Sequence, residues 1–342
     1  MNAGAEKELI MNGRTRTYVQ AARRGKDDGW RYLLGIVLVV FLWLGIGGAL
    51  SVALILAFGD AGLQSLGKDP FAHEAIGQIE RYVLVNAAFP VLLLSTVLAT
   101  ALIHRRHPRT LVTAGASVAW GRVARGFGVW LALVCAAGLL AFLVYPSAFS
   151  LRPDWATFVP FALLALVLTP IQTTSEELFF RGYLVQAGAR ISRSPVFLVV
   201  APSVLFMLLH LGNPELSLAT GAFEVSLSAL YYFAFGAFLV WVSLKDGTTE
   251  LAIGAHAAHN LFAVVLLTFE GSSLDTPALF HTDRGPDPTV NLIVFLVLAA
   301  LFCLTVFKFS KRKPAHETSS EAAAKPTGRE RPNGSNARVR DV

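Results

Sequence analysis

The 342-residue chain is 54% hydrophobic and only 15% charged, whereas a typical soluble protein is about 45–50% apolar and about 25% charged. This composition excludes a disordered chain, a coiled coil and an ordinary soluble enzyme. A net charge of +6 can indicate a nucleic-acid partner, but here the lysines and arginines gather in the two tails and in alternate loops. We therefore expect an integral membrane protein that binds no nucleic acid.

Eight apolar blocks predict transmembrane helices, because a helix needs about 20 mostly apolar residues to cross ~30 Å of hydrocarbon. They lie at residues 33–58, 82–103, 126–145, 157–185, 195–211, 221–244, 249–269 and 290–308. Two fit less well, since 157–185 ends in charged residues and 195–211 is short and contains a proline. The expected fold is all-α, a polytopic bundle of about eight transmembrane helices.

The distribution of positive charge tests this assignment independently, because cytoplasmic loops carry an excess of lysine and arginine. Of the 29 such residues, 24 fall in the tails and alternate connections, four on the opposite side, and Arg181 within a block. Eight crossings with both termini in the cytoplasm account for this alternation. Residues 1–31 are then a cytoplasmic N-terminal tail and residues 32–310 the membrane domain. Residues 311–342 are too polar to fold alone and are expected to be a disordered cytoplasmic tail.

The fourth block ends in charged residues, which are costly within a membrane: about +2.5–3.5 kcal/mol for a central Asp, Lys or Arg. Glu177 and Arg181 are four residues apart, so a helix places them on one face as an ion pair. Glu176 is rotated by about 100° from Glu177 and faces elsewhere. Pro170 precedes all three and is expected to kink the helix. The alternative is a helix end that reaches the lipid headgroups, where charges cost little.

Two more polar pairs lie in the fifth and seventh blocks. Phe206 and His210 are four residues apart, so the phenyl ring is expected to pack on the imidazole. His256 and Asn260 share a helix face in the same way, among small residues that allow close helix packing. His259, offset from His256, is expected to be structural. Taken singly, each pair is also compatible with an interfacial histidine or a polar contact between helices.

Together the three segments supply carboxylates, two imidazoles and an amide on separate helices. A carboxylate with an imidazole can activate a water, and an imidazole with an amide can stabilise an oxyanion. The same side chains could instead hold a divalent metal such as zinc. The candidate ligands would be Glu176, Glu177, His210 and His256. Both routes point to hydrolysis of a peptide bond within the membrane.

These segments resemble the motifs of the CPBP family of intramembrane proteases, the type II CAAX-processing endopeptidases and their bacterial relatives. The family pattern is Glu-Glu-x-x-x-Arg, Phe-x-x-x-His and His-x-x-x-Asn, in this order on successive helices. Here the pattern stands complete as Glu176-Glu177-x-x-x-Arg181, Phe206-x-x-x-His210 and His256-x-x-x-Asn260. The resemblance covers about residues 170–265.

The resemblance implies an eight-helix fold whose active site opens toward the cytoplasm, with a protease core at about residues 157–270. It implies that Glu176 and His210 activate the attacking water, and that His256 and Asn260 stabilise the oxyanion. Glu177, Arg181 and Phe206 would be supporting residues. The family has been described both as metalloproteases and as glutamate-type proteases, so zinc stays open as a cofactor. We expect a multi-pass protein of a bacterial cytoplasmic membrane.

Two other functions would use the same residues. A non-catalytic scaffold or a bacteriocin-immunity-type protein of this fold would act through binding alone. A proton-coupled transporter would also place glutamate and histidine in the membrane, but no pairing of broken-helix repeats is apparent. The expected partners are the lipid bilayer and a membrane protein or peptide substrate. Family members in eukaryotes process prenylated CAAX tails, but no feature of this sequence indicates that it recognises a prenyl group.

Overall fold

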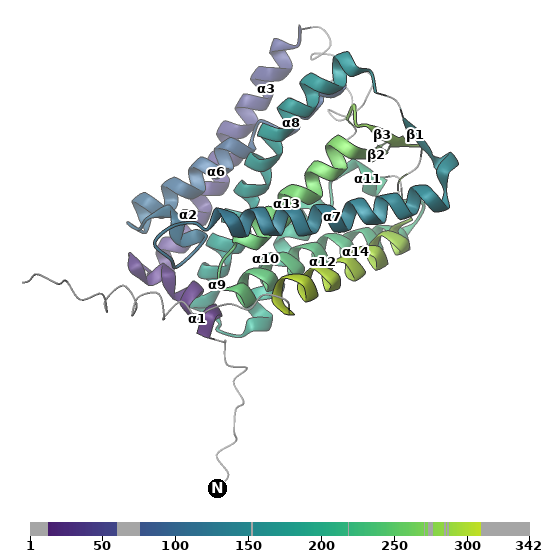
Figure 1. Ribbon diagram of the computed structural model, residues 1–342. Coiled ribbons are helices and arrows are strands. Elements are labelled where there is room, and N and C mark those ends of the chain that lie inside the picture. The colour runs from purple at the N-terminus through teal and green to yellow at the C-terminus, as the bar shows by residue number, and fades with distance from the viewer. Residues whose placement is uncertain are drawn as a thin grey trace, which may run out of the picture.

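The computed structural model describes residues 13–59, 76–151, 153–217, 219–269, 271–272, 276–283, 285 and 287–308. In this part of the chain the helices form one bundle, with α1 (Gly13–Gln20) at one end and a small sheet at the other (Figure 1). The C-terminal tail expected at 311–342 lies outside the described residues.

Six helices of the described chain are long and apolar enough to cross a membrane. They are Gly29–Ala57 (α2, Gly29–Leu42, and α3, Gly48–Ala57), Gln78–Ile103 (α5, Gln78–Asn86, and α6, Phe89–Leu98), Trp120–Val144 (α7), Trp155–Ile191 (α8, Trp155–Glu176, and α9, Val185–Ile191), Ala222–Asp246 (α12) and Pro288–Lys308 (α14, Pro288–Cys303). These helices correspond to six of the eight expected segments.

The fifth and seventh expected segments are shorter apolar helices, α10 (Pro195–His210) and α13 (Glu250–Leu261), which a π-helical turn continues to Leu266. At 1.5 Å per residue, α10 rises only about 24 Å, less than the hydrocarbon thickness. The seventh segment was expected to continue to residue 269, but Leu267–Phe269 forms strand β2 instead. Eight crossings and cytoplasmic termini stay predictions.

The small sheet was not expected from the sequence. It has the order β1-β3-β2, with β1 at Phe149–Leu151, β2 at Leu267–Phe269 and β3 at Phe280–Thr282. Strands β1 and β3 are antiparallel, with Phe149 opposite Thr282, and β2 and β3 are parallel. The sheet ties the connection that follows α7 to the segment between α13 and α14 (Figure 1).

Helices α7 and α13 pack backbone against backbone. A Cβ atom on Gly254 of α13 would collide with the Val123 carbonyl of α7, and one on Gly126 would collide with the Leu251 carbonyl. Only glycine permits this approach, which confirms the expectation that small residues near His256 allow close helix packing. The contact holds α13, with its polar residues, in the middle of the bundle.

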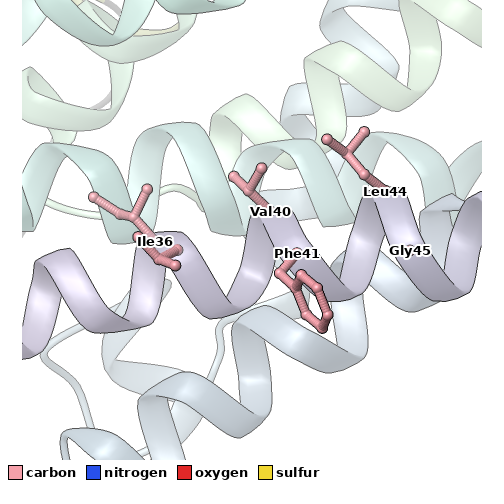
Figure 2. A pocket seen from close by; sticks show the side chains of 6 residues that line it. Ile36, Val40, Phe41, Leu44 and Gly45 are labelled. Carbon is pink, nitrogen blue, oxygen red and sulfur yellow. The ribbon is translucent and has the colours of Figure 1, made fainter.

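The outer face of the bundle is apolar, as expected for helices that contact lipid. On α2, Leu33 and Phe41 are exposed. A shallow depression along the same helix is lined only by apolar residues and glycine: Ile36, Val37, Val40, Phe41, Leu44 and Gly45 (Figure 2). None of the motif residues lines it, so we regard this depression as part of the lipid-facing surface.

The segment expected as an N-terminal tail is partly folded. Helix α1 and a following 3₁₀ turn, Ala21–Arg24, precede α2, and Tyr18, Ala21 and Ala22 are buried. Helix α1 packs on α9 and α12. Thr15 Oγ1 donates a hydrogen bond to the Leu244 carbonyl at the end of α12.

Candidate active site

The two glutamates lie where the fourth long helix changes its hydrogen-bonding pattern. Helix α8 ends at Glu176, and Glu177–Leu184 is a π-helical stretch whose residues are all buried. An ordinary α-helix was expected here. Such π-helical segments are rare and are frequent at functional sites. Pro170 lies inside α8, and the expected kink stays a prediction.

Glu177 and Arg181 form the ion pair that their spacing predicts, with Arg181 Nη1 3.0 Å from Glu177 Oε1. Both side chains are fully buried. The guanidinium lies over the ring of Phe206, 4.6 Å from its centroid, which is a cation–π contact. In the described structure Glu177 Oε2 has no hydrogen-bond partner.

His256 connects the two glutamates. Its Nδ1 lies 2.7 Å from Glu177 Oε1, and its Nε2 lies 3.7 Å from Glu176 Oε2. An ionised carboxylate only accepts hydrogen bonds, so Nδ1 carries the hydrogen and donates a hydrogen bond to Glu177. The other ring nitrogen is thereby directed at Glu176. The ring is 2% exposed and packs edge-on against Phe235.

His210 ends α10 and is held by the residue one turn before it. Its Nδ1 lies 2.7 Å from the Phe206 carbonyl oxygen. Because a carbonyl only accepts, Nδ1 is the donor and the neutral ring keeps its lone pair on Nε2. The rings of Phe206 and His210 are 4.2 Å apart, which confirms the predicted packing. The titratable groups around this imidazole are Glu176, His256 and Glu215.

Asn260 and His259 follow His256 on α13. Asn260 is partly exposed, one turn after His256. His259 uses both ring nitrogens in the core, since Trp130 Nε1 donates to its Nδ1 at 3.3 Å and its Nε2 lies 3.0 Å from Tyr231 Oη. Both ring nitrogens therefore contact packing partners, in keeping with the structural role expected for His259, which stays a prediction.

The fold thus brings the three motifs together. Glu176, Glu177, Arg181, Phe206 and His256 are linked by the contacts given above, and Phe206 joins His210 to them. Asn260 is placed by its helix alone.

Two side chains next to His210 carry no family motif and were missed by the sequence analysis. Tyr232 of α12 stacks on the imidazole, and Glu215 of the short helix α11 (Pro214–Ser217) holds Tyr232. The sequence does place a carboxylate near the second motif, because Glu215 follows His210 by five residues.

The four candidate metal ligands are not arranged as a metal site. Glu177 Oε1 is engaged by both Arg181 and His256 Nδ1. Within the described residues, no group of three or more His, Cys, Asp or Glu side chains is placed to hold a metal ion. A catalytic zinc takes three protein ligands, so the residues in this arrangement do not fit the ion.

Comparison with known proteins supports the resemblance. Residues 155–262, which contain all three motifs, match the family model of the type II CAAX prenyl endopeptidase Rce1-like proteins. The chain is 35% identical over 221 residues to the uncharacterised protein YyaK of Bacillus subtilis, covering 63% of this chain and 72% of YyaK. No solved structure matches. The chain therefore belongs to the Rce1-like type II CAAX prenyl endopeptidase family, also called the CPBP family.

Proposed function

We propose that this protein is an intramembrane endopeptidase that hydrolyses a peptide bond in a membrane-associated protein or peptide. The observation that carries the proposal is the buried cluster in which His256 lies between Glu176 and Glu177. A chain pays a large desolvation penalty for such a cluster, so a purely structural role explains it poorly. The protease core is residues 157–270, in a bacterial cytoplasmic membrane.

His256 and Asn260 stabilise the oxyanion in this proposal. The buried His256 ring lies between the two carboxylates, with Nδ1 against Glu177 and Nε2 toward Glu176. Preorganised histidine and asparagine side chains can stabilise the oxyanion of a tetrahedral intermediate, and Asn260 lies one turn further along α13.

Glu176 and His210 together activate the attacking water in this proposal. Glu176 takes a proton from the attacking water, which the Nε2 lone pair of His210 orients. The water oxygen bonds to the scissile carbonyl carbon, and the carbonyl oxygen becomes the oxyanion. Glu176 then returns its proton to the peptide nitrogen as the C–N bond breaks, leaving a carboxyl and an amine product. General-base catalysis of this type contributes about 10²–10⁴-fold to the rate.

Purified protein in lipid nanodiscs, incubated with a library of membrane peptides, tests the proposal. We expect cleavage that falls by at least about 10²-fold in Glu176→Ala and in His210→Ala. Glu80→Gln, which neutralises an exposed glutamate near the start of α5, should leave cleavage unchanged. Equal cleavage by wild type and the Glu176→Ala, His210→Ala double variant would contradict the proposal. Complementation of a deletion strain by well-expressed Glu176→Gln would favour the scaffold function instead.

A further inference from the structure

Two aromatic rings hold the imidazole of His210, and only one of them belongs to a family motif. Phe206 contributes the first, from the same helix. The second is Tyr232 of α12, whose ring is stacked on the imidazole with centroids 4.6 Å apart and planes 27° apart. Because the Phe206 carbonyl occupies Nδ1, the ring packing decides where the remaining nitrogen, Nε2, points.

The hydroxyl of Tyr232 is held by a closed set of hydrogen bonds. Asn213 Nδ2 donates to Tyr232 Oη at 2.9 Å and to Glu215 Oε1 at 3.1 Å. Tyr232 Oη donates to the same Glu215 oxygen. All three side chains are partly buried. A hydrogen bond to an ionised acceptor is about twice as strong as a neutral one, so the carboxylate anchors the tyrosine firmly.

His210 needs such an anchor because of its place in the fold. It is the last residue of α10, where helices fray, and Leu211 and Gly212 after it are exposed. The chain then turns back, and the backbone N–H of Asn213 donates a hydrogen bond to the backbone carbonyl of His210. Asn213 and Glu215 therefore attach this turn to α12 through their hydrogen bonds to Tyr232. Because the Tyr232 ring stacks on His210, they also restrict the position of the imidazole.

We propose that Glu215, Asn213 and Tyr232 form a positioning unit that holds the His210 imidazole in the orientation needed to act on water. The proposal rests on the proposed function above. An error of about 1 Å in the placement of a catalytic group can cost about 10²-fold in rate. An interaction that matters only in the transition state lowers kcat and leaves KM unchanged.

The kinetic constants of purified variants test the unit. Tyr232→Phe keeps the ring but releases it from Glu215, and we expect kcat to fall about 10-fold with KM within about twofold of wild type. Tyr232→Leu removes the ring, and kcat should fall about 10²-fold. Glu215→Ala should match Tyr232→Phe, and Glu215→Gln, which retains an acceptor oxygen, should recover most of the rate.

A double variant adds a test that a merely structural role would not pass. Because both side chains act through one hydrogen bond, Tyr232→Phe with Glu215→Ala should be no slower than either single variant, whereas independent effects would multiply. The matched controls are Glu224→Gln, a partly exposed glutamate in the first turn of α12 that accepts from the Thr220 backbone amide, and Tyr145→Phe, an exposed tyrosine. Both should keep wild-type kcat and KM. Thermal unfolding in detergent verifies that each variant is folded.

The outcomes distinguish a failure of the positioning unit from a failure of the proposed function. If Glu176→Gln cleaves as fast as wild type, the proposed function fails and the positioning unit with it. If Glu176→Gln is inactive but folded Tyr232→Leu keeps the wild-type kcat, only the positioning unit is overturned. A Glu215→Gln variant as slow as Glu215→Ala, or multiplicative effects in the double variant, would likewise overturn it.

Discussion

Arg181 is the residue on which the charge balance of the site depends. Its guanidinium is the permanent positive charge that faces Glu177, and both of these side chains are fully buried. Phe206 covers it on one side, so the same phenyl ring contacts both this cation and His210. Removing Arg181 would leave the Glu177 carboxylate buried and paired only with His256.

Arg181→Met should therefore destabilise the protein by about 3–5 kcal/mol, the typical cost of breaking a buried ion pair on one side. The free energy of unfolding can be measured by titration with SDS in mixed micelles. Arg190→Met is the control, because Arg190 is half-exposed and lies 3.5 Å from Asp27. Exposed pairs contribute at most about 1 kcal/mol. An equal decrease in the free energy of unfolding in the two variants would show that the buried pair contributes no more than the exposed one.

The engagement of Glu177 by Arg181 and His256 also leads to a prediction about metals. Since the candidate ligands within the described residues form no group placed to hold a metal ion, we expect the proposed peptidase activity to survive exhaustive chelation. Activity before and after dialysis against a strong chelator is the measurement. Loss of activity that zinc restores, but magnesium does not, would reverse this prediction and restore zinc as a cofactor.

At the scale of elements, α1 extends the site beyond the region that matches the family model. Tyr18 is fully buried, and its hydroxyl lies 2.9 Å from the carbonyl oxygens of both Leu111 and Arg181. Helix α1 thus contacts the backbone of the π-helical stretch that carries the ion pair. Burial, with the nearby Glu177 charge as a second cause, raises the pKa of Tyr18, so its hydroxyl stays neutral.

Tyr18→Phe should cost about 1 kcal/mol of stability near neutral pH, the usual net value of a hydrogen bond. In the unfolded chain the Tyr18 hydroxyl ionises at about pH 10, whereas in the folded protein the hydroxyl stays neutral at that pH. Its contribution is therefore complete below that pH and is lost as the pH rises further. The free energy of unfolding should be measured at about pH 8 and at about pH 11. The gap in this free energy between wild type and Tyr18→Phe should be smaller at the higher pH. A gap that widens, or that Tyr145→Phe reproduces, would contradict this.

At the scale of the whole molecule, the six long apolar helices make a multi-pass arrangement, and we propose eight crossings. The connection between α6 and α7 then faces the cytoplasm, while the connection with β1 faces the other side. Ser117 and Ser147 are exposed representatives of the two connections. The free cysteines to be replaced first are Cys135 and Cys303.

Single cysteines at these two positions test the topology. In intact spheroplasts, a membrane-impermeant maleimide should label Ser147→Cys and spare Ser117→Cys. Inverted vesicles should give the opposite pattern, because the excess of arginine near Ser117 retains that connection in the cytoplasm. Labelling of both positions from one side would show that α7 does not cross the membrane as proposed.

The sequence by itself determined the membrane class, the positions of the helices and the residue types of the candidate site. Hydrophobic length and charge are local properties, so the eight segments could be predicted from composition along the chain. The Glu177–Arg181 pair and the packing of Phe206 on His210 were also predictable, because residues four apart on a helix are neighbours.

Only the tertiary structure decided which groups meet across helices. The placement of His256 between the two glutamates depends on the glycine contacts of α13 with α7, far from either glutamate in sequence. The π-helical stretch, the small sheet and the stacking of Tyr232 on His210 depend on neighbours that no local pattern specifies. The physical reason is that side-chain orientation within a bundle is set by packing between helices, which periodicity along one helix does not encode.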